Sequence, residues 1–142
     1  MLNKLKKAKK NNKGFSLVEL IIVVAILAIL VGILAPQYIK WVEKSRVAKD
    51  ETNADELLNA VQVAIADDSY EIDETMTASL AAGGVTASNE ILKGALNDIY
   101  GSENLEKAGL VSSEYKARTY TVTIKKGADN GLTASGDWTP KS

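Results

Sequence analysis

The chain has 142 residues, a formal net charge of −1, and neither cysteine nor histidine. Without those two residue types it has no disulfide, no cysteine or histidine nucleophile, no histidine-ligated haem and no ordinary zinc site. Its length suits one globular domain together with a membrane anchor.

Charge is distributed unevenly along the chain. Residues 1–14 hold six of the 17 basic side chains and no acidic one, so residues 15–142 carry 11 basic against 18 acidic side chains. By the positive-inside rule, a cationic segment before an apolar one predicts that the N-terminal end stays in the cytoplasm and the rest lies outside. The acidic remainder also argues against direct electrostatic binding of nucleic acid.

The apolar run that follows is long enough to cross a membrane. The 20 residues from Leu20 to Ile39 carry no formal charge, and as an α-helix they would be about 30 Å long, the thickness of a hydrocarbon core. Residues 15–35 are apolar on every side except at Ser16, Glu19 and Gly32. A helix without a polar face is suited to lipid or to a packed bundle.

Glu19 is the unusual residue in this run. A carboxylate in the hydrocarbon region costs about 2.5 kcal/mol or more, so we expect Glu19 to have a positively charged partner. The alternative is a position among lipid headgroups, because Glu19 lies only five residues after Gly14.

Residues 14–20, Gly-Phe-Ser-Leu-Val-Glu-Leu after a lysine-rich leader, resemble the class III signal of type IV pilin precursors. The resemblance implies that a prepilin peptidase in the membrane cuts between Gly14 and Phe15 and methylates Phe15, the new N-terminus. It implies that Glu19 meets the terminal amine of a neighbouring subunit during assembly. Pro36 matches the helix-kinking proline of that family, and we expect the kink near Gly32 and Pro36.

Other interpretations of this region fit less well. An ordinary secretory signal needs a shorter apolar core and small residues before the cleaved bond, whereas a cut after Ala35 would have Ile33 before it and Pro36 after it. An uncleaved anchor explains the hydrophobicity but leaves Glu19 and the Gly14–Phe15 junction unexplained. Pro36 is also compatible with the first turn of a separate second helix.

From residue 40 to about 66 the pattern becomes amphipathic, which predicts one helix from residue 15 to about 66. The intervening charges are interpreted as a solvated face, on which Arg46 and Asp50, four residues apart, would form an ion pair. The apolar positions recur at spacings of three, four and seven: Val42, Val47, Ala54, Leu57, Leu58, Val61, Ala64 and Ile65.

The next segments predict a loop and two short helices. Thr75–Asn89 is small and polar around Gly83 and Gly84, and we interpret it as a surface loop. Ser88 or Asn89 would cap a helix that reaches Ile99 and stops at Gly101. A helical turn over Glu103–Ala108 would end at Gly109, followed by a buried Leu110–Val111 pair.

The last segments predict a β-hairpin. Tyr115–Lys126 alternates, with Tyr120, Val122 and Ile124 on one face and the threonines on the other. Residues 127–131 form a turn, and Leu132–Trp138 is the partner strand. Asp129 and Asp137 flank this hairpin; oxygen ligands suit calcium, but Asp is also an ordinary turn residue.

The predicted fold is therefore α+β, the type IV pilin fold, in which a long N-terminal helix packs on a small antiparallel sheet of two or three strands. Residues 1–14 would be the leader that the peptidase removes. Residues 15–39 would form the transmembrane and fibre-core helix, and residues 40–142 the soluble head with the second half of the long helix.

The resemblance implies a structural subunit that polymerises into a type IV pilus for adhesion, surface motility or biofilm formation. Its partners would be copies of itself, the prepilin peptidase, a cytoplasmic assembly ATPase and a platform membrane protein. The alternative is a pseudopilin of a type II secretion system or a competence pilin for DNA uptake. No cofactor or metal is expected, and no nucleophile–base pair or phosphate loop indicates an enzyme. The precursor would be a single-pass membrane protein and the product an extracellular fibre.

Overall fold

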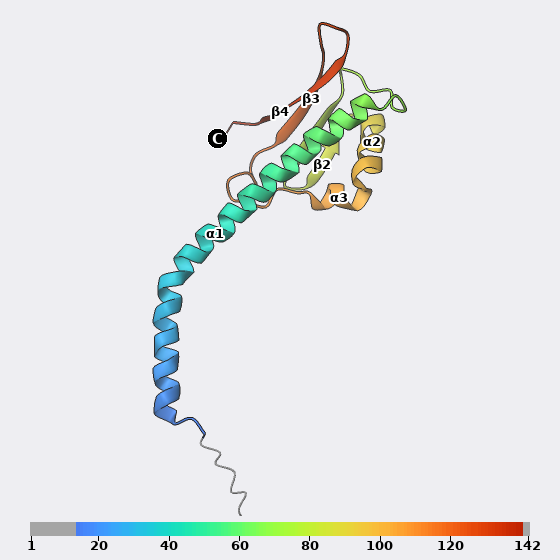
Figure 1. Cartoon of the computed structure of the whole chain (residues 1–142). Helices are drawn as coiled ribbons and strands as arrows, with labels where there is room; N and C mark the ends of the chain where they lie inside the picture. The colour runs from blue at the N-terminus through green and yellow to red at the C-terminus, as the bar shows by residue number, and fades with distance from the viewer. Residues whose placement is uncertain (1–13, 141–142) are drawn as a thin grey trace, which may run out of the picture. The chain divides into compact units, whose positions relative to one another are not determined.

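The structure is a computed structural model that describes residues 14–140, and it is divided into two compact units between Ile39 and Lys40. It contains helices and one antiparallel sheet, so the α+β prediction is confirmed. The elements are α1 (Leu17–Ala66), β1 (Thr77–Ala81), β2 (Gly84–Ala87), α2 (Glu90–Tyr100), α3 (Ser102–Lys107), β3 (Tyr120–Lys126) and β4 (Leu132–Trp138) (Figure 1).

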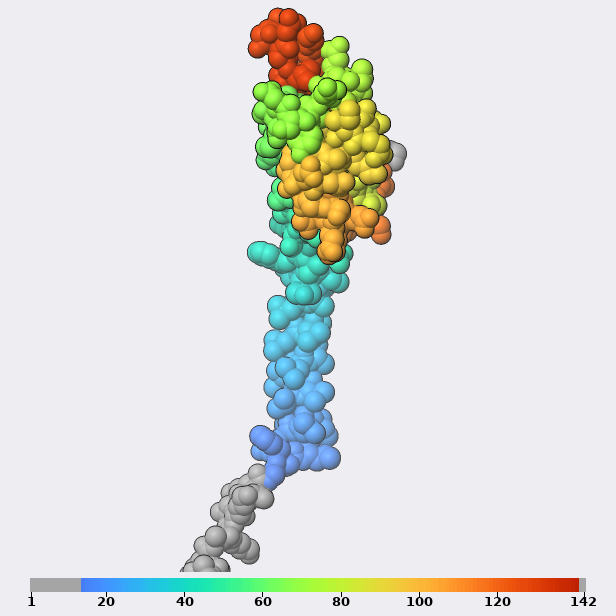
Figure 2. All heavy atoms as spheres, turned by 90° about the vertical axis from the view of Figure 1, so that its right-hand side faces the viewer, coloured from blue at the N-terminus to red at the C-terminus, as the bar shows by residue number. Residues whose placement is uncertain are grey.

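The long helix α1 runs for 50 residues and includes Pro36. Its continuity contradicts the interpretation that Pro36 begins a separate second helix. Residues 14–41 are all exposed within the chain, and Figure 2 shows this segment, coloured blue to cyan, as a continuous surface of its own side chains on the face turned to the viewer. Within residues 14–140 this segment has no apolar partner, and a helix of this composition is suited to burial in lipid or against another molecule.

The sheet has the strand order β2-β1-β3-β4, with every neighbouring pair antiparallel. In β3 the side chains of Tyr120, Val122 and Ile124 are buried, whereas Thr121 and Thr123 are half-buried on the opposite face. This is the predicted alternation. The second half of α1 crosses the buried face of the sheet (Figure 1).

The core is one cluster to which α1, α2, α3 and the strands all contribute. From α1 it takes Ala54, Leu57, Ala60 and Val61, which confirms the amphipathic pattern predicted after residue 40. A sheet of four short strands buries too little apolar surface alone. The helix therefore completes the core of the head.

Thr75–Asn89, predicted to be a loop, is instead a β-hairpin, and the sheet has four strands rather than two or three. The loop prediction was wrong because β1 and β2 consist mostly of small residues with weak strand preference. Pairing of β1 with both β2 and β3 stabilises them. Gly84 has φ of +104°, and a side chain there would meet the Leu105 carbonyl at 2.6 Å, so glycine is required.

Several boundaries differ from the predicted ones. The side-chain oxygen of Asn89 accepts the Ile91 N–H at 2.7 Å, which confirms the predicted cap of α2. β3 begins at Tyr120 rather than at residue 115, because residues 112–118 form turns closed by backbone hydrogen bonds. Of the pair predicted to be buried, Leu110 is buried but Val111 is 43% exposed.

The prediction that Asp50 lies on a solvated face is wrong, because its side chain is fully buried. Its carboxylate accepts hydrogen bonds from the backbone N–H groups of Val111 (3.0 Å) and Ser112 (2.8 Å) and from the Ser112 hydroxyl. The predicted ion pair between Asp50 and Arg46 is also wrong. Arg46 instead pairs with Glu43, with its Nη1 atom 3.7 Å from Glu43 Oε2. Asp50 therefore fixes the returning chain against α1.

Glu43 makes a similar contact two helical turns earlier. Its Oε1 accepts the backbone N–H of Ser113 at 2.5 Å and the Ser113 hydroxyl at 2.6 Å. The hydroxyl hydrogen bond, and then the backbone one, lower the pKa of Glu43 below its ordinary value. Glu43 and Asp50 together hold residues 111–113 along α1.

Replacing Asp50 with alanine should destabilise the head by about 3 kcal/mol, because the N–H and hydroxyl of buried Ser112 and the part-buried N–H of Val111 lose a charged acceptor. Denaturant unfolding of the full chain in detergent, followed by tryptophan fluorescence, measures this. The control is Asp55→Ala on the exposed side of α1, which should change stability by no more than about 0.5 kcal/mol. Equal effects of the two substitutions would show that Asp50 is not an anchor.

The Glu43–Ser113 contact predicts an acid-dependent loss of stability. Because the pKa of Glu43 is lower in the folded chain than in the unfolded one, its contribution is full above the unfolded pKa and disappears as pH falls through the folded value. Unfolding curves measured from neutral to strongly acidic pH should fall less steeply for Glu43→Gln than for the wild type. Ser113→Ala, which removes one of the two donors, should be intermediate. Superimposable profiles would contradict the contact.

Candidate processing and assembly site

The predicted cleavage junction lies just before α1. Gly14, Phe15 and Ser16 precede the first helical residue, and Phe15 is 92% exposed. The Glu19 N–H donates to the Ser16 hydroxyl at 3.1 Å, and the Ser16 N–H donates to Glu19 Oε2 at 2.8 Å. This is a reciprocal capping box that satisfies two of the free donors at the helix start.

The capping box gives Glu19 a second possible role that the sequence analysis missed, although its Ser-x-x-Glu signature is present in residues 16–19. The carboxylate lies at the positive end of the helix dipole, which favours a negative charge there. Its bonded donor, the Ser16 N–H, belongs to the peptide bond directly after Phe15. Within residues 14–140 only Oε2 accepts a hydrogen bond, so Oε1 is open to a further donor.

The first half of α1 exposes a continuous apolar surface far larger than that of an ordinary soluble monomer, and such a surface marks a membrane or protein interface. By length and composition α1 contains a segment able to cross a membrane. Its exposed large side chains are Leu17, Val18, Leu20, Ile21, Ile22, Val23, Val24, Ile26, Leu27, Ile29, Leu30, Val31, Ile33, Leu34, Tyr38, Ile39 and Trp41.

Gly32 and Pro36, the residues predicted to form a kink, stand one helical turn apart within α1. Proline has no N–H, so the helical bond that residue 36 would donate to the Gly32 carbonyl is missing. A side chain at Gly32 would meet no other part of the described chain. The helix is weakened at this point but remains continuous.

The C-terminal hairpin contains an aromatic cluster. The rings of Tyr115 and Trp138 stack with centroids 4.2 Å apart, and Tyr120 lies 5.0 Å from Trp138. The Arg118 guanidinium is 5.2 Å from the Tyr115 ring and 5.5 Å from that of Trp138, a cation–π arrangement. These contacts join the end of β4 to the chain before β3.

The acidic residue in the hairpin turn has a local role. Asp129 Oδ1 accepts the Gly131 N–H at 3.2 Å, as turn residues commonly do. Within residues 14–140 no group of three or more carboxylates is arranged to hold a metal ion.

Comparison with known proteins identifies the family. Residues 9–35 match the prokaryotic N-terminal methylation motif. The chain is 33% identical over 105 residues to the type IV major fimbrial protein FimA of Dichelobacter nodosus. The aligned region covers 68% of this chain and 67% of that protein. The chain belongs to the type IV pilin family. A second FimA of that organism is 31% identical over 119 residues, covering 84% of this chain and 70% of the relative.

A shorter similarity supports the same assignment. The type IV major pilin protein PilA of Myxococcus xanthus is 45% identical over 49 residues, 34% of this chain and 22% of PilA. No solved structure matches the chain. The protein is thus a structural subunit of type IV pili rather than an enzyme, with an N-methylation motif and an apolar helix compatible with a transmembrane segment.

Proposed function

We propose that this pilin is made as a membrane-bound precursor, cut between Gly14 and Phe15, and N-methylated on Phe15. It is then assembled into a surface fibre for adhesion, motility or biofilm formation. The observation that carries the proposal is the coincidence of the methylation motif over residues 9–35 with an exposed, non-helical junction immediately before an apolar helix. A peptidase needs an accessible bond outside a helix, and residues 14–16 are exposed and non-helical.

After cleavage, the new amine of Phe15 and the carboxylate of Glu19 provide opposite charges in an apolar surrounding. We infer that Glu19 pairs with the amine of a neighbouring subunit. A buried pair adds little net stability, but an unpaired buried charge costs about 3–5 kcal/mol. The pair therefore selects one axial register between neighbouring helices.

The proposal assigns three parts to the precursor: a leader (1–14), a transmembrane and fibre-core helix (15–39), and an extracellular head (40–142). The leader lies in the cytoplasm because its lysines resist translocation. A cytoplasmic ATPase and a platform protein drive assembly. The relatives are named as major fimbrial and major pilin proteins, which favours a pilus over the pseudopilin and competence alternatives. Long fibres on the cell surface would separate a pilus from a secretion pseudopilus.

Mass spectrometry of the chain from cells should find an N-terminus at methylated Phe15. Gly14→Val should leave the full precursor in the membrane and the cells without surface fibres, because a branched side chain next to the scissile bond obstructs the peptidase. Gly32→Ala is the control and should be processed normally, since a side chain there meets nothing in the chain. A wild-type chain that keeps Met1 or begins near Pro36, or normal maturation of Gly14→Val, would contradict the proposal.

Three substitutions separate the charge of Glu19 from its capping role. Glu19→Gln keeps a capping-box acceptor but removes the charge. Ser16→Ala removes the hydroxyl cap but keeps the charge, and Glu19→Ala removes the charge and the acceptor of the Ser16 N–H but keeps the hydroxyl cap. If charge pairing sets the register, Glu19→Gln and Glu19→Ala should each lower the fibre sheared from cells by at least about tenfold. Ser16→Ala should assemble. The membrane pool of processed chain, measured by immunoblot, should be unchanged. Wild-type fibre yield from Glu19→Gln would disprove the pairing.

A further inference from the structure

The head's part of α1 begins with basic side chains. Lys40 is the first charged residue after the uncharged run that ends at Ile39, and Lys44 lies about one helical turn, or about 6 Å, further along the axis. A headgroup layer is about 5–8 Å deep on each side of a hydrocarbon core. When residues 20–39 fill that core, both lysines therefore lie at the level of the lipid phosphates. The exposed Trp41 between them is of the residue type enriched at this interface.

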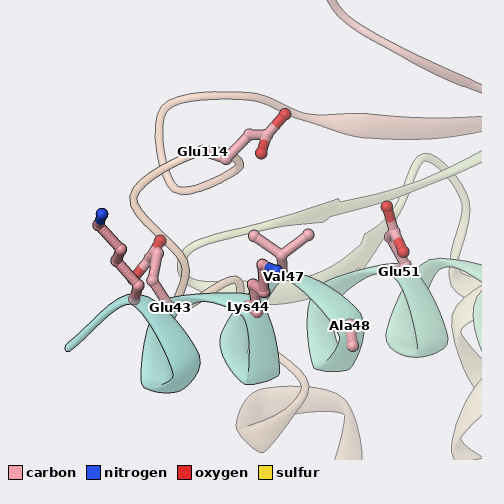
Figure 3. Close-up of a pocket in the computed structure, with 7 residues that line it drawn as sticks. Glu43, Lys44, Val47, Ala48, Glu51 and Glu114 are labelled. Carbon is pink, nitrogen blue, oxygen red and sulfur yellow. The ribbon is translucent and has the colours of Figure 1, made fainter. Parts of the chain in front are cut away.

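A groove of about 460 Å³ opens beside these lysines. Its α1 wall carries two basic and two small apolar side chains, those of Lys40, Lys44, Val47 and Ala48. Glu114 faces the groove from the loop before β3 (Figure 3). The groove therefore has cationic side chains on one wall and a carboxylate opposite them.

Glu114 stands at the level of the two lysines because its neighbour is anchored there. It follows Ser113, whose N–H and hydroxyl bind Glu43 Oε1 at 2.5 Å and 2.6 Å. Glu43 belongs to the same helical turn as the lysines. Its own charge is already engaged, since Arg46 lies 3.7 Å from its other carboxylate oxygen. The anchor thus brings a further carboxylate beside two cations.

Some of the charges in the lining remain available to a ligand. Lys40, Lys44 and Glu114 are exposed and form no ion pair with another residue of the described segment 14–140. Glu51, at the far end of the groove, accepts a hydrogen bond from the Tyr115 hydroxyl at 3.2 Å. The groove offers two cations and an anion at one height, an arrangement suited to a ligand that carries both signs of charge.

This arrangement is complementary to the headgroup of phosphatidylethanolamine. In that lipid an ethylene link joins the phosphodiester anion to a primary ammonium, so the lysines can bind the phosphate while Glu114 accepts N–H bonds from the ammonium. Phosphatidylglycerol has no cation and would place its anion beside an unpaired carboxylate. Phosphatidylcholine has a quaternary ammonium without an N–H donor. Charge complementarity therefore favours phosphatidylethanolamine over the other two.

We propose that this groove binds the headgroup of phosphatidylethanolamine in the membrane-bound pool of subunits, with the phosphate at Lys40 and Lys44 and the ammonium at Glu114. The inference rests on the membrane-bound precursor proposed above, because only there does the groove meet lipid. Each ion pair is partly solvated and weak, so the groove selects among lipids rather than binding one tightly. A subunit that leaves the membrane gives up this lipid.

Native mass spectrometry of the full chain ejected from lipid nanodiscs tests the groove. The discs contain equal amounts of phosphatidylethanolamine, phosphatidylglycerol and phosphatidylcholine. The lipid retained by the wild type should be enriched about fivefold in phosphatidylethanolamine over each of the others, as two weak ion pairs provide. Lys44→Gln should lower this enrichment to about twofold or less. Lys126→Gln, the same change at an exposed position of β3, is the control and should leave it unchanged.

Glu114→Lys gives a sharper test, because it should change which lipid is retained. Cations then line both walls of the groove, so the enrichment should pass from phosphatidylethanolamine to phosphatidylglycerol. Glu71→Lys is the matched control, the same change of charge at an exposed position in the loop after α1, and should keep the wild-type preference. Unchanged selectivity of Glu114→Lys, or the same switch in Glu71→Lys, would overturn the proposal.

The wild-type chain alone can also refute the groove. Equal enrichment of phosphatidylethanolamine and phosphatidylglycerol would show an unselective basic surface, and equal retention of phosphatidylethanolamine and phosphatidylcholine would show that the N–H donors are not recognised. Either result would overturn the groove but not the pilus. Soluble phosphoethanolamine added to discs of phosphatidylcholine should not be retained, because it lacks the high effective concentration of a membrane lipid; its retention would overturn the assignment to lipid. A chain that does not enter the discs would contradict the membrane-bound precursor and the groove together.

Discussion

The structure depends on α1 covering one face of the sheet. Leu57 and Val61 of this helix are fully buried against a core to which Leu80, Val122 and other strand residues contribute. Without the helix, four short strands would expose that face to water. The same helix begins with a segment that is exposed throughout in the part of the chain that the structure describes. One continuous element thus stabilises the head and carries the surface that only lipid or other subunits can bury.

The carboxylates of α1 have different roles because different donors reach them. Glu19 binds the N–H of Ser16 at the helix start, whereas Asp50 is enclosed by backbone donors from a segment about sixty residues later. Asp55 is exposed and available to another molecule. Sequence alone shows the same residue type at each position. The position of the rest of the chain decides whether a carboxylate caps, anchors or remains open.

Local signals in the sequence predicted the elements that local physics determines. Apolar spacing predicted α1, Asn89 predicted the start of α2, and alternation with a glycine-rich turn predicted the β3–β4 hairpin. The β1–β2 hairpin was not predicted because its small residues become strands only through pairing with β3. The buried position of Asp50 was not predicted because its hydrogen-bond donors are distant in sequence. At the candidate site, the residues from Gly14 to Glu19 lie within the motif that the family comparison matched. The capping contact of Ser16 was missed although its Ser-x-x-Glu spacing is present in the sequence.

The proposed contact between Glu19 and a terminal amine implies a displacement between neighbours. Pairing of Glu19 with a Phe15 amine straight across corresponds to an offset of about four residues, or about 6 Å. Because the amine and the carboxylate belong to different residues, a subunit can give its amine to one neighbour and its carboxylate to another. That relation repeats along an axis and does not close into a pair. Apolar packing alone is non-directional and would let helices slide. The charge pair at the start of α1 converts that packing into a fibre with a defined rise.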